Sequence, residues 1–141
     1  MRCRRSALSI YCNFHLTSLF YASAVFNNDI NLAHNTRLRS FHLKIFHRHP
    51  TPLTWVITLL SQITSLYLVH ILLEFQLEDL SLLSTIDWTQ MESVFNQQRW
   101  PNLQKVKFFW YGLPDITSGL AVRAFIKAHF PELESRGILR F

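Results

Sequence analysis

Glycine and charged side chains are scarce in this chain. Its 141 residues include three glycines, and Asp, Glu, Lys and Arg together make up 16% of the sequence. So few glycines cannot build the glycine-rich loops that cradle phosphate groups, and they exclude a collagen-like repeat. Because 49% of the residues are hydrophobic, the composition also excludes a disordered chain. The sequence therefore predicts one packed domain, or part of one.

Cysteine and catalytic motifs are equally sparse. The two cysteines, Cys3 and Cys12, match neither a zinc-binding spacing nor a disulfide framework, so we expect reduced thiols. The nucleophile elbow G-x-S-x-G, the dinucleotide-binding motif G-x-G-x-x-G and the zinc motif H-E-x-x-H are all missing from the sequence. Because these catalytic motifs are missing, we predict that the chain is not an enzyme.

Two groups of ionisable residues contain the side-chain types that metal sites and acid–base catalysis need. The first consists of three histidines, His42, His47 and His49. Arg48 lies inside this group and disfavours a cation, so we expect no metal site there. The second group is acidic and consists of Glu74, Glu78 and Asp79. We interpret it as a solvated turn or helix start, because nothing in the sequence indicates a pocket around it. The sequence thus predicts no cofactor.

Acidic residues are nearly missing from the first half of the chain. Residues 1–73 contain seven Lys or Arg and one acid, Asp29, whereas residues 74–141 contain seven basic and eight acidic side chains. The net charge of +5 therefore comes from the first half. Nucleic acids attract such charge, but the sequence has no recognition-helix motif and no basic run longer than Arg4 and Arg5. Nucleic acid is not the favoured partner.

Long apolar runs are confined to two segments. Residues 7–26 follow the basic residues at the start of the chain, and small residues near their end fit a signal-peptidase site. Asn13 and His15, however, interrupt this apolar run. Residues 53–73 carry no formal charge over the length that a bilayer requires, yet their polar centre favours a helix followed by a buried strand. We expect a cytoplasmic or nuclear protein. The alternative is a small membrane-associated or exported protein that uses one of these segments.

An apolar pattern recurs through the rest of the chain. The pattern is L-x-x-Φ-x-Φ, where Φ is apolar, and its alternation predicts a short strand with one buried face. The four copies lie at residues 38–43, 63–68, 103–108 and, less perfectly, 133–138. Apolar residues at helical spacing predict helices between the copies, the second of them capped by Thr85. The predicted helices are residues 52–60, 85–97 and 115–129.

Strands that alternate with helices predict a parallel sheet with crossover connections. We therefore predict an α/β fold, a fragment of an irregular leucine-rich-repeat-like solenoid over residues 36–141. Residues 1–35 form an N-terminal segment that is either a remnant strand or helix or a targeting-like segment. The copies start 25, 40 and 30 residues apart, which is less regular than in ordinary repeats. A small open α/β sheet is the alternative.

Four segments carry a resemblance to a known family. They are LLSQITSLYL, IDWTQMESVF, WPNLQKVKFFW and FPELESRGILRF. Through them, residues 36–141 resemble the irregular leucine-rich-repeat region of fungal (basidiomycete) F-box proteins. The F-box itself, with its Leu-Pro-x-Glu-Ile/Leu helix start, is missing from this sequence. The resemblance implies the substrate-recognition part of an F-box-type ubiquitin-ligase adaptor.

The residues between the apolar positions of each copy predict a binding surface. In a stacked parallel solenoid they face the concave side, where partners usually bind. Their cationic and aromatic side chains favour a protein partner of acidic character, and we expect no small-molecule substrate. The predicted partner-binding residues are His42, Lys44, Tyr67, Lys105, Lys107, Phe109 and Trp110.

Overall fold

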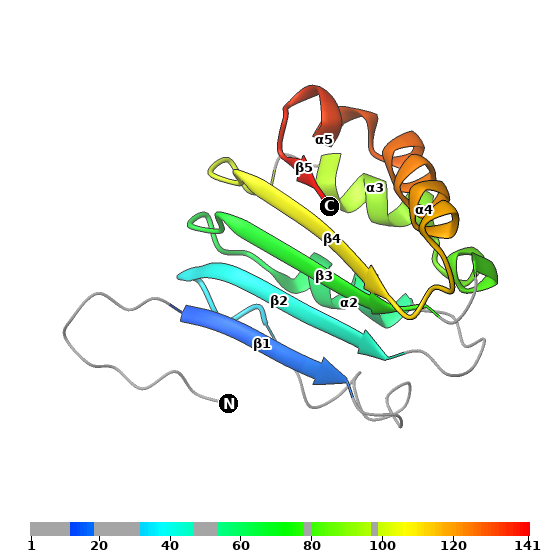
Figure 1. Ribbon diagram of the computed structural model, residues 1–141. Coiled ribbons are helices and arrows are strands. Elements are labelled where there is room, and N and C mark those ends of the chain that lie inside the picture. Colours follow the sequence, from blue (N-terminus) through cyan, green and yellow to red (C-terminus); the bar gives the residue numbers. More distant parts are fainter. Residues whose placement is uncertain (1–11, 19–31, 47–53, 78–79, 97–98) are drawn as a thin grey trace.

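A parallel sheet of five strands is the frame of the molecule. The computed structural model describes residues 12–18, 32–46, 54–77, 80–96 and 99–141. The strands follow sequence order across the sheet, and each neighbouring pair is parallel (Figure 1). They are β1 (Cys12–Ser18), β2 (Leu38–Phe46), β3 (His70–Gln76), β4 (Lys105–Tyr111) and the short β5 (Leu139–Arg140).

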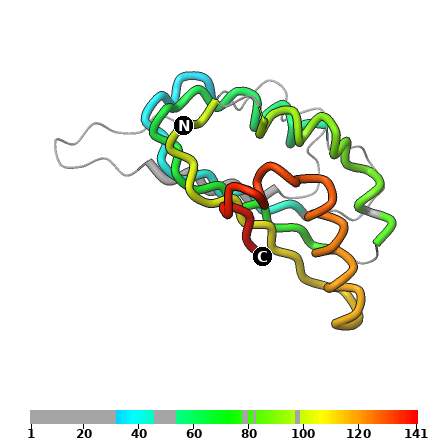
Figure 2. The backbone as a smooth tube through the Cα atoms, turned by 90° about the horizontal axis from the view of Figure 1, so that it is seen from above, coloured from blue at the N-terminus to red at the C-terminus, as the bar shows by residue number. Residues whose placement is uncertain are grey.

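The described helices lie together on one side of this sheet (Figures 1 and 2). They are α2 (Thr54–Gln62), the 3-10 helix η1 (Leu80–Thr85), α3 (Trp88–Asn96), α4 (Ile116–His129) and α5 (Pro131–Ser135). Parallel strands that follow each other in sequence need a crossover connection, and these helices supply it from β2 onward. The predicted α/β fold, with parallel strands alternating with helices, is confirmed.

One predicted strand, at residues 63–68, is wrong. This segment is the connection after α2, and β3 begins only at His70. Ile63 and Leu68 are buried, but Leu66 lies in a turn and is 60% exposed. The apolar pattern therefore marks a turn with two inward-facing residues, which single-sequence periodicity does not distinguish from a pleated strand.

The strand predicted at residues 133–138 is also wrong. Leu133 lies in α5, which begins at Pro131, and the sheet resumes only at Leu139. Proline fits the first turn of a helix because the amide that it lacks would have no partner there. Gly137 ends this helix with a φ of 66°, which only glycine adopts readily.

The register of the sheet aligns one residue from each strand. These residues are Phe14, Phe41, Ile71, Val106 and Leu139. Counted along the chain, they lie 27, 30, 35 and 33 residues apart. These separations are more regular than the predicted ones, because the copy of the apolar pattern that enters the sheet is residues 68–73, five residues after the predicted copy.

The side of the sheet that faces the helices is apolar. Its six central side chains from β2, β3 and β4 are at most 1% exposed: Phe41, Leu43, Ile71, Leu73, Val106 and Phe108. Trp88 of α3 connects the layers, because its ring lies 6.4 Å from that of Phe108 and 5.5 Å from that of Phe125 in α4. Rings at such separations add to the stabilisation from burial. This aromatic cluster holds α3 and α4 over β4.

Aspartates begin the two main helices behind β4. The Asp87 carboxylate accepts a hydrogen bond from the Gln90 amide at 2.9 Å, so Asp87 caps α3. The predicted cap, Thr85, is the last residue of η1 instead. Asp115 caps α4 and accepts from the Ser118 amide at 2.7 Å, which lowers the pKa of Asp115 below its ordinary value.

A glycine allows the backbones at the ends of β3 and β4 to approach each other closely. Gly112 has a φ of 95°, and a Cβ atom there would lie 2.8 Å from the Leu77 carbonyl oxygen. The Leu77 amide donates to the Tyr111 carbonyl oxygen at 2.9 Å just before this glycine. Any side chain at position 112 would clash with that backbone and strain its own.

The two apolar segments divide differently in the structure. The described part of residues 53–73 contributes α2, a turn and the start of β3, so the expected helix is present and the strand begins later than predicted. Of residues 7–26, positions 12–18 form β1, which pairs with β2, and the others lie outside the described residues. β1 thus belongs to the same sheet although it precedes residue 36. No helix among the described residues has the length and apolarity to cross a membrane.

Candidate partner-binding surface

The face of the sheet turned away from the helices is polar. Side chains alternate across a strand, so the residues between the buried ones point to this face. No described helix covers it (Figures 1 and 2), and we call it the open face. Its charged and aromatic residues are His42, Lys44, His70, Glu74, Lys105, Lys107, Phe109 and Tyr111.

Glu74 joins β3 to β2 at the centre of the open face. Its carboxylate oxygens lie 2.8 Å from Lys44 Nζ and 3.1 Å from His42 Nε2. Burial alone would raise the pKa of Glu74, but the hydrogen bonds from Lys44 and His42 outweigh it and lower this pKa. The same contact raises the pKa of Lys44. At neutral pH the central pair is therefore charged on both sides.

Aromatic rings extend the open face along β4. Phe109 is 44% exposed, and its ring centroid lies 6.4 Å from that of Tyr111. Lys107 Nζ lies 5.6 Å from the Phe109 ring centroid, and Lys44 Nζ lies 5.0 Å from that of Tyr111. Cations are attracted to ring faces at these distances. The surface thus combines positive charge with flat apolar area.

The structure separates the predicted partner-binding residues into two groups. Five of them share the open face: His42, Lys44, Lys105, Lys107 and Phe109. Tyr67 is 55% exposed but lies in the turn before β3, because the strand starts later than predicted. Trp110 points to the helix side, where its ring packs against Phe141 at 5.6 Å. Partner binding by any of them stays a prediction.

Three residues of the open face were not among the predicted partner-binding residues: His70, Glu74 and Tyr111. Glu74 was interpreted as part of a solvated turn or helix start, which is wrong because it lies within β3. Its partner Lys44 is 30 residues away, and only the correct copy of the apolar pattern brings the two into register. Tyr111 follows Phe109 by two residues, so the alternation of β4 carried its signal. Glu78 and Asp79 lie outside the described residues.

The structure describes one of the three histidines that the sequence offered as metal ligands. His42 contacts the Glu74 carboxylate, whereas His47 and His49 lie outside the described residues. In the described ranges, no three side chains of His, Cys, Asp or Glu come close enough to hold a metal ion. The open face is therefore a charged and aromatic surface on which Glu74 forms an ion pair with Lys44 and contacts His42.

Comparison with known proteins adds no relative. No family model matches the chain, and no curated protein or solved structure matches it either. The function has to be argued from the residues of the chain itself.

Proposed function

We propose that this chain is a non-catalytic protein-interaction module whose open face binds an acidic segment of a protein partner. The observation that supports this best is the charge of the open face. Its three lysines outnumber its single acid, Glu74, which already pairs with Lys44. Lys105 and Lys107 on the neighbouring strand then give the surface a net positive potential, which favours acidic partners and speeds their association.

Phe109 is the proposed anchor for this partner. It lies beside Glu74 of β3 in the register of the sheet and keeps almost half of its surface exposed. Aromatic side chains at the centre of a protein interface contribute most of its binding energy when a partner covers them. A partner segment that places an apolar side chain on Phe109 and carboxylates near Lys107 would satisfy both features.

The regular spacing of the strands supports a solenoid of the leucine-rich-repeat kind. Equivalent residues recur every 27 to 35 residues, and each strand lies beside the one before it. Side chains in one strand-helix unit also donate to backbone carbonyls in the preceding unit. The donor and acceptor pairs are Ser65 with Leu38, Trp100 with Ile63 and Asn102 with Leu66, at 2.8, 3.1 and 2.8 Å. Stacked units of a solenoid are joined in this way.

The resemblance to F-box proteins suggests what such a partner would be used for. A partner recognised by the open face would be presented to a ubiquitin ligase. This role predicts that a protein bound through Lys107 is ubiquitinated in cells that express the chain, and less so with Lys107→Glu.

Binding of a defined acidic peptide tests the proposal. The probe is a labelled peptide of Glu and Asp residues with one central Phe, titrated by fluorescence anisotropy at 50 and 200 mM salt. We expect Lys107→Glu to weaken binding about tenfold, mainly at low salt, because attraction between exposed charges is screened. Phe109→Ala should weaken binding at both salt concentrations.

Arg136→Glu is the matched control for charge. It makes the same change in net charge at an exposed position in the turn between α5 and β5, away from the open face. Equal weakening by Arg136→Glu and Lys107→Glu would contradict a defined surface. Tighter and steeply salt-dependent binding of a single-stranded DNA of equal charge would favour a nucleic-acid function instead.

A further inference from the structure

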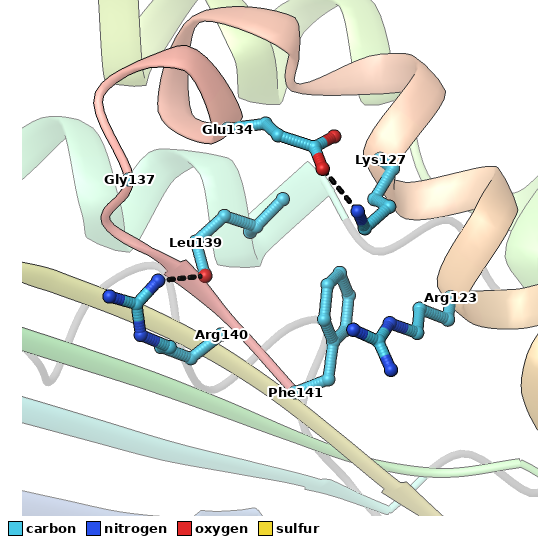
Figure 3. Close-up of a pocket in the computed structure, with 7 residues that line it drawn as sticks. All are labelled: Arg123, Lys127, Glu134, Gly137, Leu139, Arg140 and Phe141. Atoms are coloured by element: carbon cyan, nitrogen blue, oxygen red, sulfur yellow. Dashed lines mark hydrogen bonds and ion pairs between the residues drawn. The ribbon is translucent and has the colours of Figure 1, made fainter.

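A second positively charged region lies at the last strand, next to the edge of the open face. There α4, α5 and β5 enclose an open cavity of about 360 Å³ (Figure 3). The side chains that give it its chemistry are Arg123 and Lys127 from α4, Glu134 from α5, and Arg140 and Phe141 at the end of the sheet. The volume is at the lower end of small-molecule pockets, which hold roughly 300–1,000 Å³.

Two arginines reach this cavity from opposite sides. The Arg123 guanidinium lies 5.1 Å from the Phe141 ring centroid, and that ring is itself held by Trp110. Arg140 is aligned with Lys107 in the sheet, but its Nη1 donates to the Leu139 carbonyl oxygen at 2.7 Å. Each contact fixes the position of a guanidinium and uses at most part of its five donors. The remaining donors suit an oxygen-rich anion.

The charge of the cavity is unbalanced. Lys127 pairs with Glu134, as Figure 3 shows, and Arg123 and Arg140 have no carboxylate in the cavity's side-chain lining. The side chains around the cavity therefore carry three positive charges and one negative charge. A phosphate monoester carries about −1.5 to −2 at pH 7, and its oxygens can accept hydrogen bonds from both guanidiniums that lack a carboxylate side chain in the lining.

We propose that this cavity binds the phosphate group of a small phosphate monoester. Arg123 and Arg140 bind the phosphate oxygens, Lys127 adds charge, and Phe141 forms an apolar wall for the organic part. Guanidinium groups bind phosphate with paired hydrogen bonds, which gives the site its preference for this group. Four of the five cavity side chains come from outside the open face, and Arg140, which is aligned with Lys107, borders it.

Titration with phenyl phosphate tests this assignment. The readout is the change in the amide signal of Gly137 and in the Nε–Hε signals of Arg123 and Arg140, measured by NMR on the full chain at pH 7.5 and constant ionic strength. We expect saturable shifts with phenyl phosphate, shifts at several-fold higher concentration with the monoanion phenyl sulfate, and none with phenol. A response to phenol that equals the response to phenyl phosphate would overturn the proposal.

Three substitutions separate a specific site from general charge. Arg123→Gln and Arg140→Gln should each weaken phenyl phosphate binding about tenfold, because each removes a charged hydrogen bond. Glu134→Gln should strengthen binding several-fold, because it releases Lys127. Arg37→Gln, which changes an exposed charge in the turn before β2, is the control and should leave the affinity unchanged.

Folding controls and the direction of each change in affinity decide whether the cavity is a phosphate site. Circular dichroism establishes that each variant is folded, and an unfolded Arg123→Gln chain leaves Arg140→Gln and Glu134→Gln to decide. Weakening of equal size by Arg37→Gln, or weakening by Glu134→Gln, would overturn the proposal. So would the absence of any saturable shift up to a concentration of about 10 mM, since Kd values above this correspond to less than about 3 kcal/mol of binding free energy.

Discussion

The two faces of the sheet differ in almost every respect although the same strands supply both. Leu73 and Phe108, on the helix side, are fully buried, whereas their chain neighbours Leu72 and Phe109 reach the open face. The helix side is apolar, and the open face carries lysines, histidines and an ion pair. One face therefore supplies the apolar burial that holds the fold. The other adds little to the apolar core, so its residues can be replaced with little loss of stability.

The difference has an energetic basis. Full burial of a large apolar side chain contributes about 1.5–3 kcal/mol, so the central residues of the helix side account for much of the stability. An exposed ion pair contributes about 0–1 kcal/mol. The same substitution at two neighbouring residues of a strand should therefore lower the free energy of unfolding much more on the helix side than on the open face.

A charge placed on the helix side should have the largest effect. Leu73→Glu buries a carboxylate among apolar side chains, and we expect it to cost about 5 kcal/mol or more, comparable to the whole stability of a small domain. Loss of the cooperative unfolding transition, followed by circular dichroism in urea, is the expected result. Leu72→Glu is the matched control, because its neighbours in register are His42 and Lys107. It should cost less than about 1 kcal/mol, and equal loss from both would break the comparison.

Truncation of two neighbouring phenylalanines to alanine should give the next largest difference in stability between the faces. Phe108 is 0% exposed and its ring lies 5.2 Å from that of Phe130, so Phe108→Ala should lower the free energy of unfolding by about 3–5 kcal/mol. Phe109→Ala should lower it by less than about 1 kcal/mol. Urea unfolding at pH 7 measures both values. If Phe109→Ala were the more costly, the open face would be part of the core.

Much of this architecture follows from the sequence, for a physical reason. The alternation around Phe41 and Val106 predicted two strands correctly, because one buried and one exposed face give period two. The helix predicted at residues 115–129 agrees with α4, whose N-terminus is capped by the Asp115 carboxylate. Five of the seven residues predicted to bind a partner lie on one surface because that alternation also fixes which residues share a face.

The rest depended on information that one sequence does not hold. Residues 63–68 and 68–73 both fit the apolar pattern, and only pairing with β2 and β4 selects the second. That choice placed Tyr67 in a turn and Glu74 in a strand. Trp110 is different: it follows Phe109 directly, so the alternation of β4 already assigns it to the helix side, where its ring packs against that of Phe141. The cavity at β5 combines residues from three elements, so no local pattern could indicate it.

The smallest predicted effect concerns the ion pair on the open face. Glu74→Gln removes the carboxylate that Lys44 and His42 share, and we expect a loss of about 0.5–1 kcal/mol at pH 7. The pKa of Glu74 is lowered in the folded state relative to its ordinary value of 4.5. The stabilisation from this group is therefore fully present above pH 4.5 and is lost as the pH falls through the lower, folded value.

Urea unfolding of both proteins at pH 7, 5, 4 and 3 measures this dependence. The wild-type chain should lose more stability than Glu74→Gln below pH 4.5, so the difference between the two should shrink toward pH 3. A difference that stays constant over this range would mean that Glu74 acts through packing and not through its charge. The helix side has no titrating partner among its six central residues, so this acid-dependent difference, unlike the loss from Phe108→Ala, is specific to the open face.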